Sequence, residues 1–131
     1  MKTFEFGNNM LTVSIHNTEF TRDPAEVEVA FSAARKAILD FNEKLNRGEA
    51  TRTDIEETIG EIMILIDEGL GAGASNRIFS GMDAVSLHDC GDVVTYVLTC
   101  TNEFENRKKG EYSGYTAQNR QQKRNQQFKR Q

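Results

Sequence analysis

Few residues in this chain of 131 residues have the types and spacing that chemistry requires, and the nearest match is a glycine-rich segment. Gly69-x-Gly71-x-x-Ala74 has the letters of a dinucleotide-binding turn. That turn needs a strand leading into the first glycine and a long helix whose amino end meets the pyrophosphate. Here Asp67 and Glu68 precede the glycines and would repel phosphate. The pattern therefore argues against nucleotide binding.

Residue types that bind metals gather at His88-Asp89-Cys90 and Asp92. Their spacing matches no zinc pattern, and Cys100 has no second ligand two to four residues away. If Cys90 and Cys100 share one helix, they lie about 15 Å apart along its axis. We therefore expect no metal site and two reduced, buried thiols instead of a disulfide.

Catalytic acids or nucleophiles are not evident either. The carboxylates that could form a catalytic pair follow a helical pattern, which predicts that they mostly face solvent; they are Glu56, Glu57, Glu61, Asp67 and Glu68. No serine or cysteine has an evident general base, and His16 stands alone in a strand-like segment without an assigned role. We expect a protein that is not an enzyme and that uses no cofactor.

Charge is distributed very unevenly along the chain. Residues 1–106 hold eight Lys/Arg and 19 Asp/Glu, a net charge of −11, whereas residues 107–131 hold eight Lys/Arg and one acid, a net charge of +7. The basic end is a candidate interaction tail for an acidic partner, which could be nucleic acid or the acidic body (residues 1–106) of another copy of the chain. Its candidate contact residues are Arg120, Lys123, Arg124, Phe128, Lys129 and Arg130.

The elements that position these residues can be predicted from periodicity. Phe4-Glu5-Phe6 and Leu11–Ile15 alternate apolar and polar residues around a turn at Gly7-Asn8-Asn9, which predicts an N-terminal β-hairpin. Asp23-Pro24-Ala25-Glu26 predicts a helix start with Asp23 as the N-cap. One apolar face then recurs every three or four residues at Val27, Phe31, Ala34, Ile38, Phe41 and Leu45, and the helix is expected to end at Asn46-Arg47-Gly48.

A second helix is predicted from a capping box at Thr53-Asp54-Ile55-Glu56, with apolar residues at Ile55, Ile59, Ile62, Ile66 and Leu70. Gly69, Gly71 and Gly73 are expected to reverse the backbone, and a short turn over residues 74–80 ends at Gly81. Ser86 or Asp89 is expected to cap a last helix, although Val93–Leu98 could instead form a strand. The predicted core includes Phe31, Ile38, Ile59, Ile62 and Phe79.

These elements predict a mainly α fold, a small helical domain with an N-terminal β-hairpin and a flexible basic C-terminal tail. The domain is expected to cover residues 1–109, and the tail residues 110–131, which should be disordered or loosely helical. Residues 110–115 resemble a flexible linker. The sequence has no apolar run of membrane-spanning length and no secretory signal, so the expected location is the cytoplasm.

The segment from Ile66 to Gly81 resembles a motif of the tail assembly chaperones of long-tailed bacteriophages. In that family a helix ends in an acidic residue and is followed by a glycine-rich corner, a small hydroxyl residue and an Ile/Val-Phe-Gly ending. The matching residues here are Glu68, Gly71, Gly73, Ser75, Ile78, Phe79 and Gly81. The match departs at Ser80, which separates Phe79 from Gly81. A looser resemblance extends over roughly residues 4–106.

The resemblance implies a protein that binds the tape-measure protein, keeps it soluble and helps recruit tail-tube subunits in the host cytoplasm. It also implies that a frameshift can yield a longer product, and self-association fits the charge pattern. The alternatives are a small regulatory or nucleic-acid-binding module that acts through the basic tail, and a structural virion component.

Overall fold

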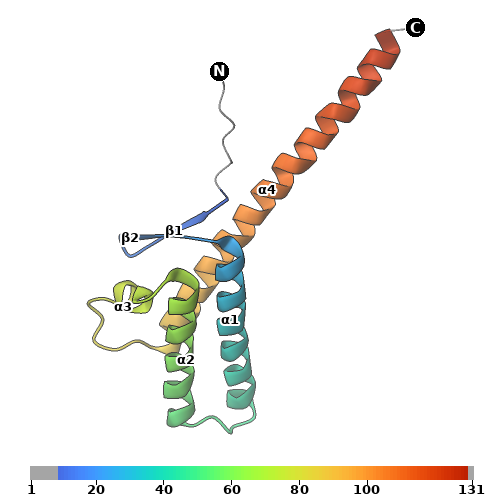
Figure 1. Cartoon of the computed structure of the whole chain (residues 1–131). Helices are drawn as coiled ribbons and strands as arrows, with labels where there is room; N and C mark the ends of the chain where they lie inside the picture. The colour runs from blue at the N-terminus through green and yellow to red at the C-terminus, as the bar shows by residue number, and fades with distance from the viewer. Residues whose placement is uncertain (1–8, 130–131) are drawn as a thin grey trace. The chain divides into compact units, whose positions relative to one another are not determined.

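The computed structural model describes the backbone of residues 9–129 and the side chains of residues 9–110. Its elements in chain order are β1 (Leu11–Ile15), β2 (Thr18–Arg22), α1 (Pro24–Asn46), α2 (Arg52–Leu70), α3 (Ala74–Ile78) and α4 (Leu87–Lys129) (Figure 1). The chain divides into two compact units, residues 1–101 and 102–131. The fold is therefore mainly helical, with four helices after an N-terminal antiparallel hairpin in the described residues, as the sequence predicted.

The hairpin joins β1 and β2 through the two-residue turn His16-Asn17. Both turn residues have positive φ, +51° and +62°, which matches the twist that a two-residue hairpin turn requires. Val13 pairs with Phe20 across the ladder, and both side chains are buried together with Leu11. The hairpin thus has one apolar face, and that face lies in the core.

The described hairpin contains one predicted strand and one that was not predicted. Leu11–Ile15 is a strand as predicted, and it pairs with Thr18–Arg22, which was not predicted as a strand. The predicted first strand, Phe4–Phe6, and most of its turn lie outside the described residues. The observed turn was missed because it contains no glycine; asparagine tolerates positive φ better than most residues, and here a histidine shares the turn with it.

Helix α1 begins and ends where the sequence predicted. The Asp23 carboxylate accepts a hydrogen bond from the Ala25 backbone N–H at 3.0 Å, and Pro24 occupies the first helical position. At the other end Arg47 and Gly48 donate backbone hydrogen bonds to the last turn, and Gly48 has φ +72°. These caps supply partners for backbone groups that a helix end leaves unpaired.

Helix α2 begins two residues earlier than predicted. Thr51, not Thr53, is the N-cap: its side chain accepts from the Asp54 N–H at 3.2 Å, and the Asp54 carboxylate accepts from the Thr51 N–H at 2.8 Å. The sequence has two overlapping patterns of a threonine followed three residues later by an acidic residue, at 51–54 and 53–56, and either could form a capping box. The upstream pattern forms the box, and Thr53 lies inside the helix.

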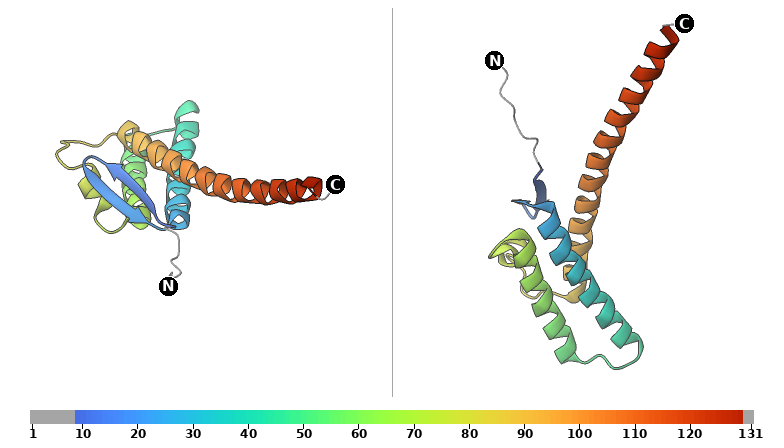
Figure 2. Two further views of the ribbon diagram at one scale, coloured as in Figure 1. Left: turned by 90° about the horizontal axis from the view of Figure 1, so that it is seen from above. Right: turned by 45° about the vertical axis from the view of Figure 1, so that its right-hand side comes forward.

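The core forms where α1 and α2 pack side by side as an antiparallel hairpin, with the β-hairpin across their upper ends (Figure 2). Its largest fully buried side chains come from four elements: Val13, Val27, Phe31, Ile62, Ile66, Cys90, Val94 and Val97. Phe31, Ile62 and Phe79 are buried as predicted.

The predicted burial of Ile38 and Ile59 is wrong, because both are only half-buried. Further along the same apolar faces Leu45 and Ile55 are exposed. The apolar periodicity of α1 and α2 therefore continues past the end of the packed core, toward the loop that joins the two helices. Periodicity indicates which face is apolar, but it does not indicate how far a covering element extends.

Helix α4 begins with a capping box. The Asp89 N–H donates to Ser86 Oγ at 3.1 Å, and the Ser86 N–H donates to Asp89 Oδ2 at 2.9 Å, so both candidate capping residues take part. Cys90, Val94, Val97 and Thr101 are buried at helical spacing, which excludes the alternative strand at Val93–Leu98.

In the second unit the backbone is helical from residue 102 to Lys129, including residues 110–115, which the sequence predicted as a flexible linker. Near its start the cationic groups of Arg107 and Lys108 lie 6.0 Å and 5.6 Å from the centroid of the Phe104 ring. Within the described part of the chain, no helix combines the length and the apolar character that a membrane crossing requires.

Candidate functional site

Residues 67–81 carry nearly all of the chaperone-like motif. They comprise the end of α2, the turn that follows it, α3 and the residues up to Gly81, and we call this segment the glycine corner. Gly71, Gly73 and Gly81 have φ of +113°, +81° and +84°. Such values strain other residues, so these three glycines set the path of the chain. Gly73 precedes the first residue of α3, and Gly81 follows its end.

Gly69 serves a different purpose from the one predicted. It lies within α2, and its backbone does not reverse. A Cβ atom at this position would come within 2.9 Å of Phe31 Cε2 and 3.1 Å of the Ala30 Cβ. Gly69 therefore allows α1 and α2 to approach closely at the buried Phe31 ring.

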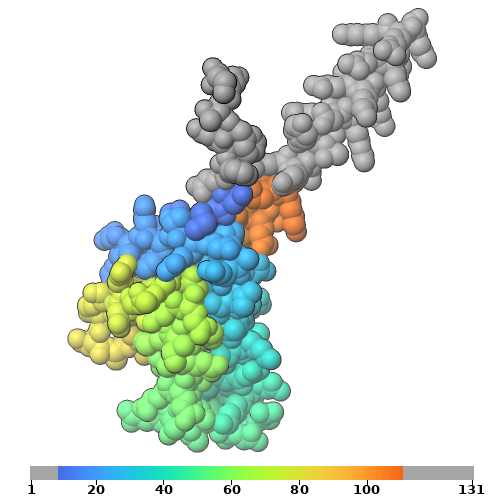
Figure 3. All heavy atoms as spheres, in the orientation of Figure 1, coloured from blue at the N-terminus to red at the C-terminus, as the bar shows by residue number. Residues whose placement is uncertain are grey.

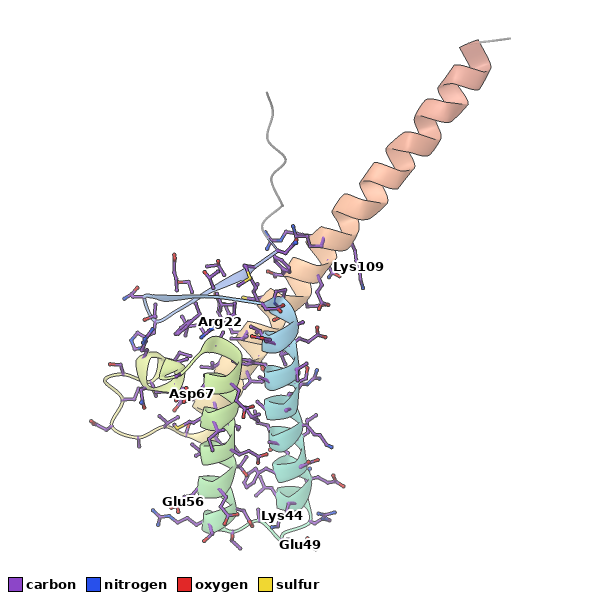
Figure 4. The ribbon with its side chains drawn as sticks, in the orientation of Figure 1. Arg22, Lys44, Glu49, Glu56, Asp67 and Lys109 are labelled. Atoms are coloured by element: carbon purple, nitrogen blue, oxygen red, sulfur yellow. The ribbon has the colours of Figure 1, made fainter. Side chains whose placement is uncertain are left out.

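Arg22, the last residue of β2, ties the hairpin to the corner. Its Nε donates a hydrogen bond to the Leu70 carbonyl oxygen at 2.9 Å, which satisfies a carbonyl at the end of α2. A Cβ atom on Gly71 would overlap the Arg22 guanidinium. Gly71 thus supplies both the positive φ and the space in which Arg22 lies. Figure 4 shows Arg22 and Asp67 at the same end of α2.

Asp67 connects the two helices of the corner. Its Oδ1 accepts a hydrogen bond from the Ser75 N–H at 2.8 Å, and its backbone oxygen accepts from the Gly71 N–H at 2.8 Å. Ser75 is buried, with 5% of its surface exposed. The Asp67 carboxylate is therefore committed to holding α3 in place, and the neighbouring Glu68 is exposed on α2.

A second tie joins the hairpin turn to the end of α3. His16 Nδ1 lies 2.9 Å from the Ile78 carbonyl oxygen, and Ile78 and Phe79 are buried below it. In the space-filling view the hairpin lies directly against the corner (Figure 3). Six of the seven predicted motif residues set the turn or fill its interior, so the motif specifies a structural corner, with Glu68 at its surface.

A comparison with protein families matches residues 8–127 to DUF6673, described as a family of unknown function. The chain belongs to the DUF6673 family. The matched range includes the hairpin, the glycine corner and nearly all of α4. Comparisons with the curated proteins and with the solved structures gave no match.

The other predicted groups of this DUF6673 chain are spread over its surface and core. His88 Nε2 lies 3.7 Å from Asp92 Oδ2 on the exposed side of α4, whereas Cys90 is buried. Glu56 pairs with Arg52 at 3.6 Å on an exposed turn of α2. Among the residues that the structure describes, no group of three or more His, Cys, Asp or Glu is placed to hold a metal ion.

Among the described side chains, two carboxylates have a lowered pKa, and both belong to helix caps. The Lys44 ammonium at 2.9 Å and the hydrogen bonds from Thr51 lower the pKa of Asp54. The hydrogen bonds from Ser86 lower the pKa of Asp89. Both carboxylates are thus held ionised by structural partners. The side chains of the candidate interaction tail, Arg120, Lys123, Arg124, Phe128, Lys129 and Arg130, lie outside the described side chains.

The hydrogen bonds that join the hairpin to the glycine corner, at His16 and Arg22, could not be predicted from the sequence. Their partners are backbone carbonyls 62 and 48 residues away, and a carbonyl leaves no mark in the sequence. The available signal was local: Thr18, Phe20 and Thr21, which follow His16-Asn17, are of the β-branched and aromatic types that are enriched in strands.

Proposed function

We propose that this protein is a non-enzymatic tail assembly chaperone of a long-tailed bacteriophage, which binds and solubilises the tape-measure protein in the host cytoplasm and helps recruit tail-tube subunits. The observation that carries the proposal is the glycine corner. Seven of its residues match the chaperone motif. Three of them are glycines with positive φ that shape the turn, and three others are buried inside it. The longer frameshift product is part of the same proposal.

The surface of the helical hairpin supports this proposal. Val29 on α1 and Ile64 on α2 have 73% and 62% of their surface exposed, which is high for large aliphatic side chains. Such side chains suit recognition of an amphipathic helix in a tape-measure protein, where apolar anchors recur every three or four residues. The excess of acidic residues in the body would keep the complex soluble.

Co-expression tests the proposal directly. The tape-measure protein encoded beside this chain should remain soluble and co-purify with it, and the double variant Val29→Glu/Ile64→Glu should lose both effects. Both side chains are exposed, so the variant should fold, as circular dichroism can verify. Because the contact is apolar, the complex should survive a rise in salt from about 50 to 200 mM.

The rival function, nucleic-acid binding through the basic tail, predicts the opposite salt response. Binding that neutralises roughly six phosphates weakens by about 10³-fold or more over the same salt range. Truncation after Arg107 would abolish such binding but should leave the tape-measure complex intact. Salt-sensitive binding of DNA or RNA, with no effect on tape-measure solubility, would refute the chaperone proposal.

A further inference from the structure

A groove with a volume of about 460 Å³ lies in the first unit, between the second half of α1 and the first turns of α4. Its apolar lining comes from both helices and includes Ile38, Leu39, Phe41, Leu45, Leu87 and Val94. This is the region where the apolar faces of the helices continue beyond the packed core.

The α1 wall of the groove carries protruding aliphatic side chains. Leu39 and Leu45 each have 54% of their surface exposed, and Ile38 and Leu87 are half-buried beside them. Exposed apolar side chains beside a hollow are typical of an interaction site. The groove therefore has both a hollow and protruding apolar side chains.

The two walls also differ in charge. Arg35 lines the groove on α1, and Asp92 lines it on α4. A second hollow of about 430 Å³, between α1 and α2, is lined by Lys36, Asp40, Lys44, Asp54, Glu57 and Glu61, among others. That hollow has charged walls and lacks a comparable apolar lining, so the α1–α4 groove is the more apolar of the two hollows.

We propose that the α1–α4 groove is the interface of a two-fold symmetric dimer of this chain. In a two-fold interface the same patch meets itself, so it must contain its own complement. A symmetry axis along the groove would place α1 of each copy over α4 of the other. Leu39 and Leu45 of each copy would then enter the hollow of the other copy, and Arg35 of each copy would face Asp92 on α4 of the other. This dimer does not depend on the proposed chaperone role.

Sedimentation equilibrium of the full chain over a range of concentrations tests this dimer. The wild-type chain should show a concentration-dependent dimer, and Leu39→Glu should raise the dimer Kd by more than about tenfold, because it would bury an unpaired charge in the apolar interface. Val29→Glu is the matched control: it introduces the same charge on the same helix at a residue outside the groove, and it should leave the Kd unchanged.

A charge exchange tests the orientation of the two copies. Arg35→Asp and Asp92→Arg should each weaken self-association, because each homodimer then places like charges opposite one another. Mixing the two variants should restore dimers, since both contacts in the mixed dimer are again of opposite sign. This rescue separates a specific contact from a general change of net charge.

Three results would overturn the proposal. The first is a chain that stays monomeric at every concentration. The second is a dimer that resists Leu39→Glu but is lost on truncation after Arg107, which would place the interface in the basic segment. The third is a monomer whose capture of the tape-measure protein is abolished by Leu39→Glu, which would assign the groove to that partner. Failure of the chaperone role alone would leave the dimer measurements unchanged.

Discussion

Gly69 shows how a single missing side chain can set the distance between two helices. The Phe31 ring is fully buried and occupies the space where a Cβ on residue 69 would lie. Alanine is the better helix former, so propensity alone would favour a substitution here. The close approach of α1 and α2 opposes it, and because the Phe31 ring is fully buried, the packing cost should exceed the gain in helix propensity.

We therefore expect Gly69→Ala to lower the free energy of unfolding by about 1–3 kcal/mol. Gly60→Ala in the same helix is the matched control, since a Cβ there would meet no atom within 4 Å. That variant should gain about 0.5–1 kcal/mol from helix propensity. Urea unfolding of both variants measures the difference, and equal effects at the two positions would contradict the assigned packing.

The two cysteines should differ sharply in reactivity. Burial raises the pKa of the Cys90 thiol to about 11, with a further contribution from the Asp89 charge, and Cys90 is fully buried, whereas Cys100 is half-buried. The thiolate is the form that attacks a thiol reagent, so Cys90 is protected both by its raised pKa and by its lack of access to solvent.

In the native protein we expect Ellman's reagent to modify one thiol per chain quickly. Cys100→Ser should abolish this fast phase, and the remaining thiol should react only after guanidinium chloride unfolds the chain. A fast reaction of the Cys100→Ser variant under native conditions would mean that Cys90 is accessible and that the assigned face of α4 is wrong.

At the scale of the helices and strands, the sequence predicted local features well and distant partners poorly. The ends of α1, the short helix between Gly73 and Gly81 and the capping box of α4 depend on neighbouring residues, so their residue types and spacing reveal them. The pairing of β1 with β2 was not predicted because its turn, His16-Asn17, lacks the usual glycine.

The burial of a residue depends on which element covers its face of the helix, and a local sequence pattern does not show that element. Ile38 and Ile62 occupy equivalent positions in two similar apolar patterns, yet Ile62 is fully buried and Ile38 is not. The glycine corner, likewise, could be predicted only in part from the sequence. Its glycines predicted a turn, but its hydrogen bonds from Arg22 and His16 depend on how the hairpin packs.

The buried face of α2 can be tested by truncating one side chain. Ile62→Ala should lower the free energy of unfolding by about 2–5 kcal/mol, because it leaves a cavity in a fully packed core. Ile64→Ala is the control from the opposite face, where 62% of the side chain is exposed, and it should change the stability by less than about 0.5 kcal/mol. A loss below about 0.5 kcal/mol at Ile62 would show that the face is wrongly assigned.

The α2 capping box predicts a pH dependence at the α1–α2 loop. Figure 4 shows Lys44 near this loop, where its ammonium contacts the Asp54 carboxylate. The pKa of Asp54 is lowered in the folded state, so the ionised carboxylate stabilises the folded protein. This contribution to the free energy of unfolding is fully present above the unfolded-state pKa of about 3.9, and it is lost as pH falls through the lower folded-state value.

Asp54→Asn should therefore lower the Tm at neutral pH, and the difference from wild type should shrink below about pH 4. Thermal unfolding followed by circular dichroism between pH 7 and pH 2 would measure it. Glu56→Gln is a suitable control, because its carboxylate lies on an exposed turn and pairs only with the exposed Arg52 at 3.6 Å among the contacts described for it. A difference that grows as pH falls would contradict the sign of the pKa shift.

At the scale of the whole molecule, packing and charge divide the chain at nearly the same place. The first compact unit ends at Thr101, which is buried, and the excess of basic residues begins at Arg107. The apolar residues that form the core and line the α1–α4 groove all belong to the first unit. Folding and the proposed self-association should therefore both be properties of residues up to about 101, whereas the net charge of +7 is a property of residues 107–131.

Truncation after Arg107 tests this division. The removed segment is rich in Gln, Lys and Arg and has little apolar surface to contribute to a core, so the Tm should change by less than about 2 °C. Truncation after Leu98 is the contrasting variant: it removes the buried Thr101 and the half-buried Cys100, and it should lower the Tm clearly. A large loss of Tm after the first truncation would mean that the basic segment packs on the body or on a second copy, and the division of the chain proposed here would then be wrong.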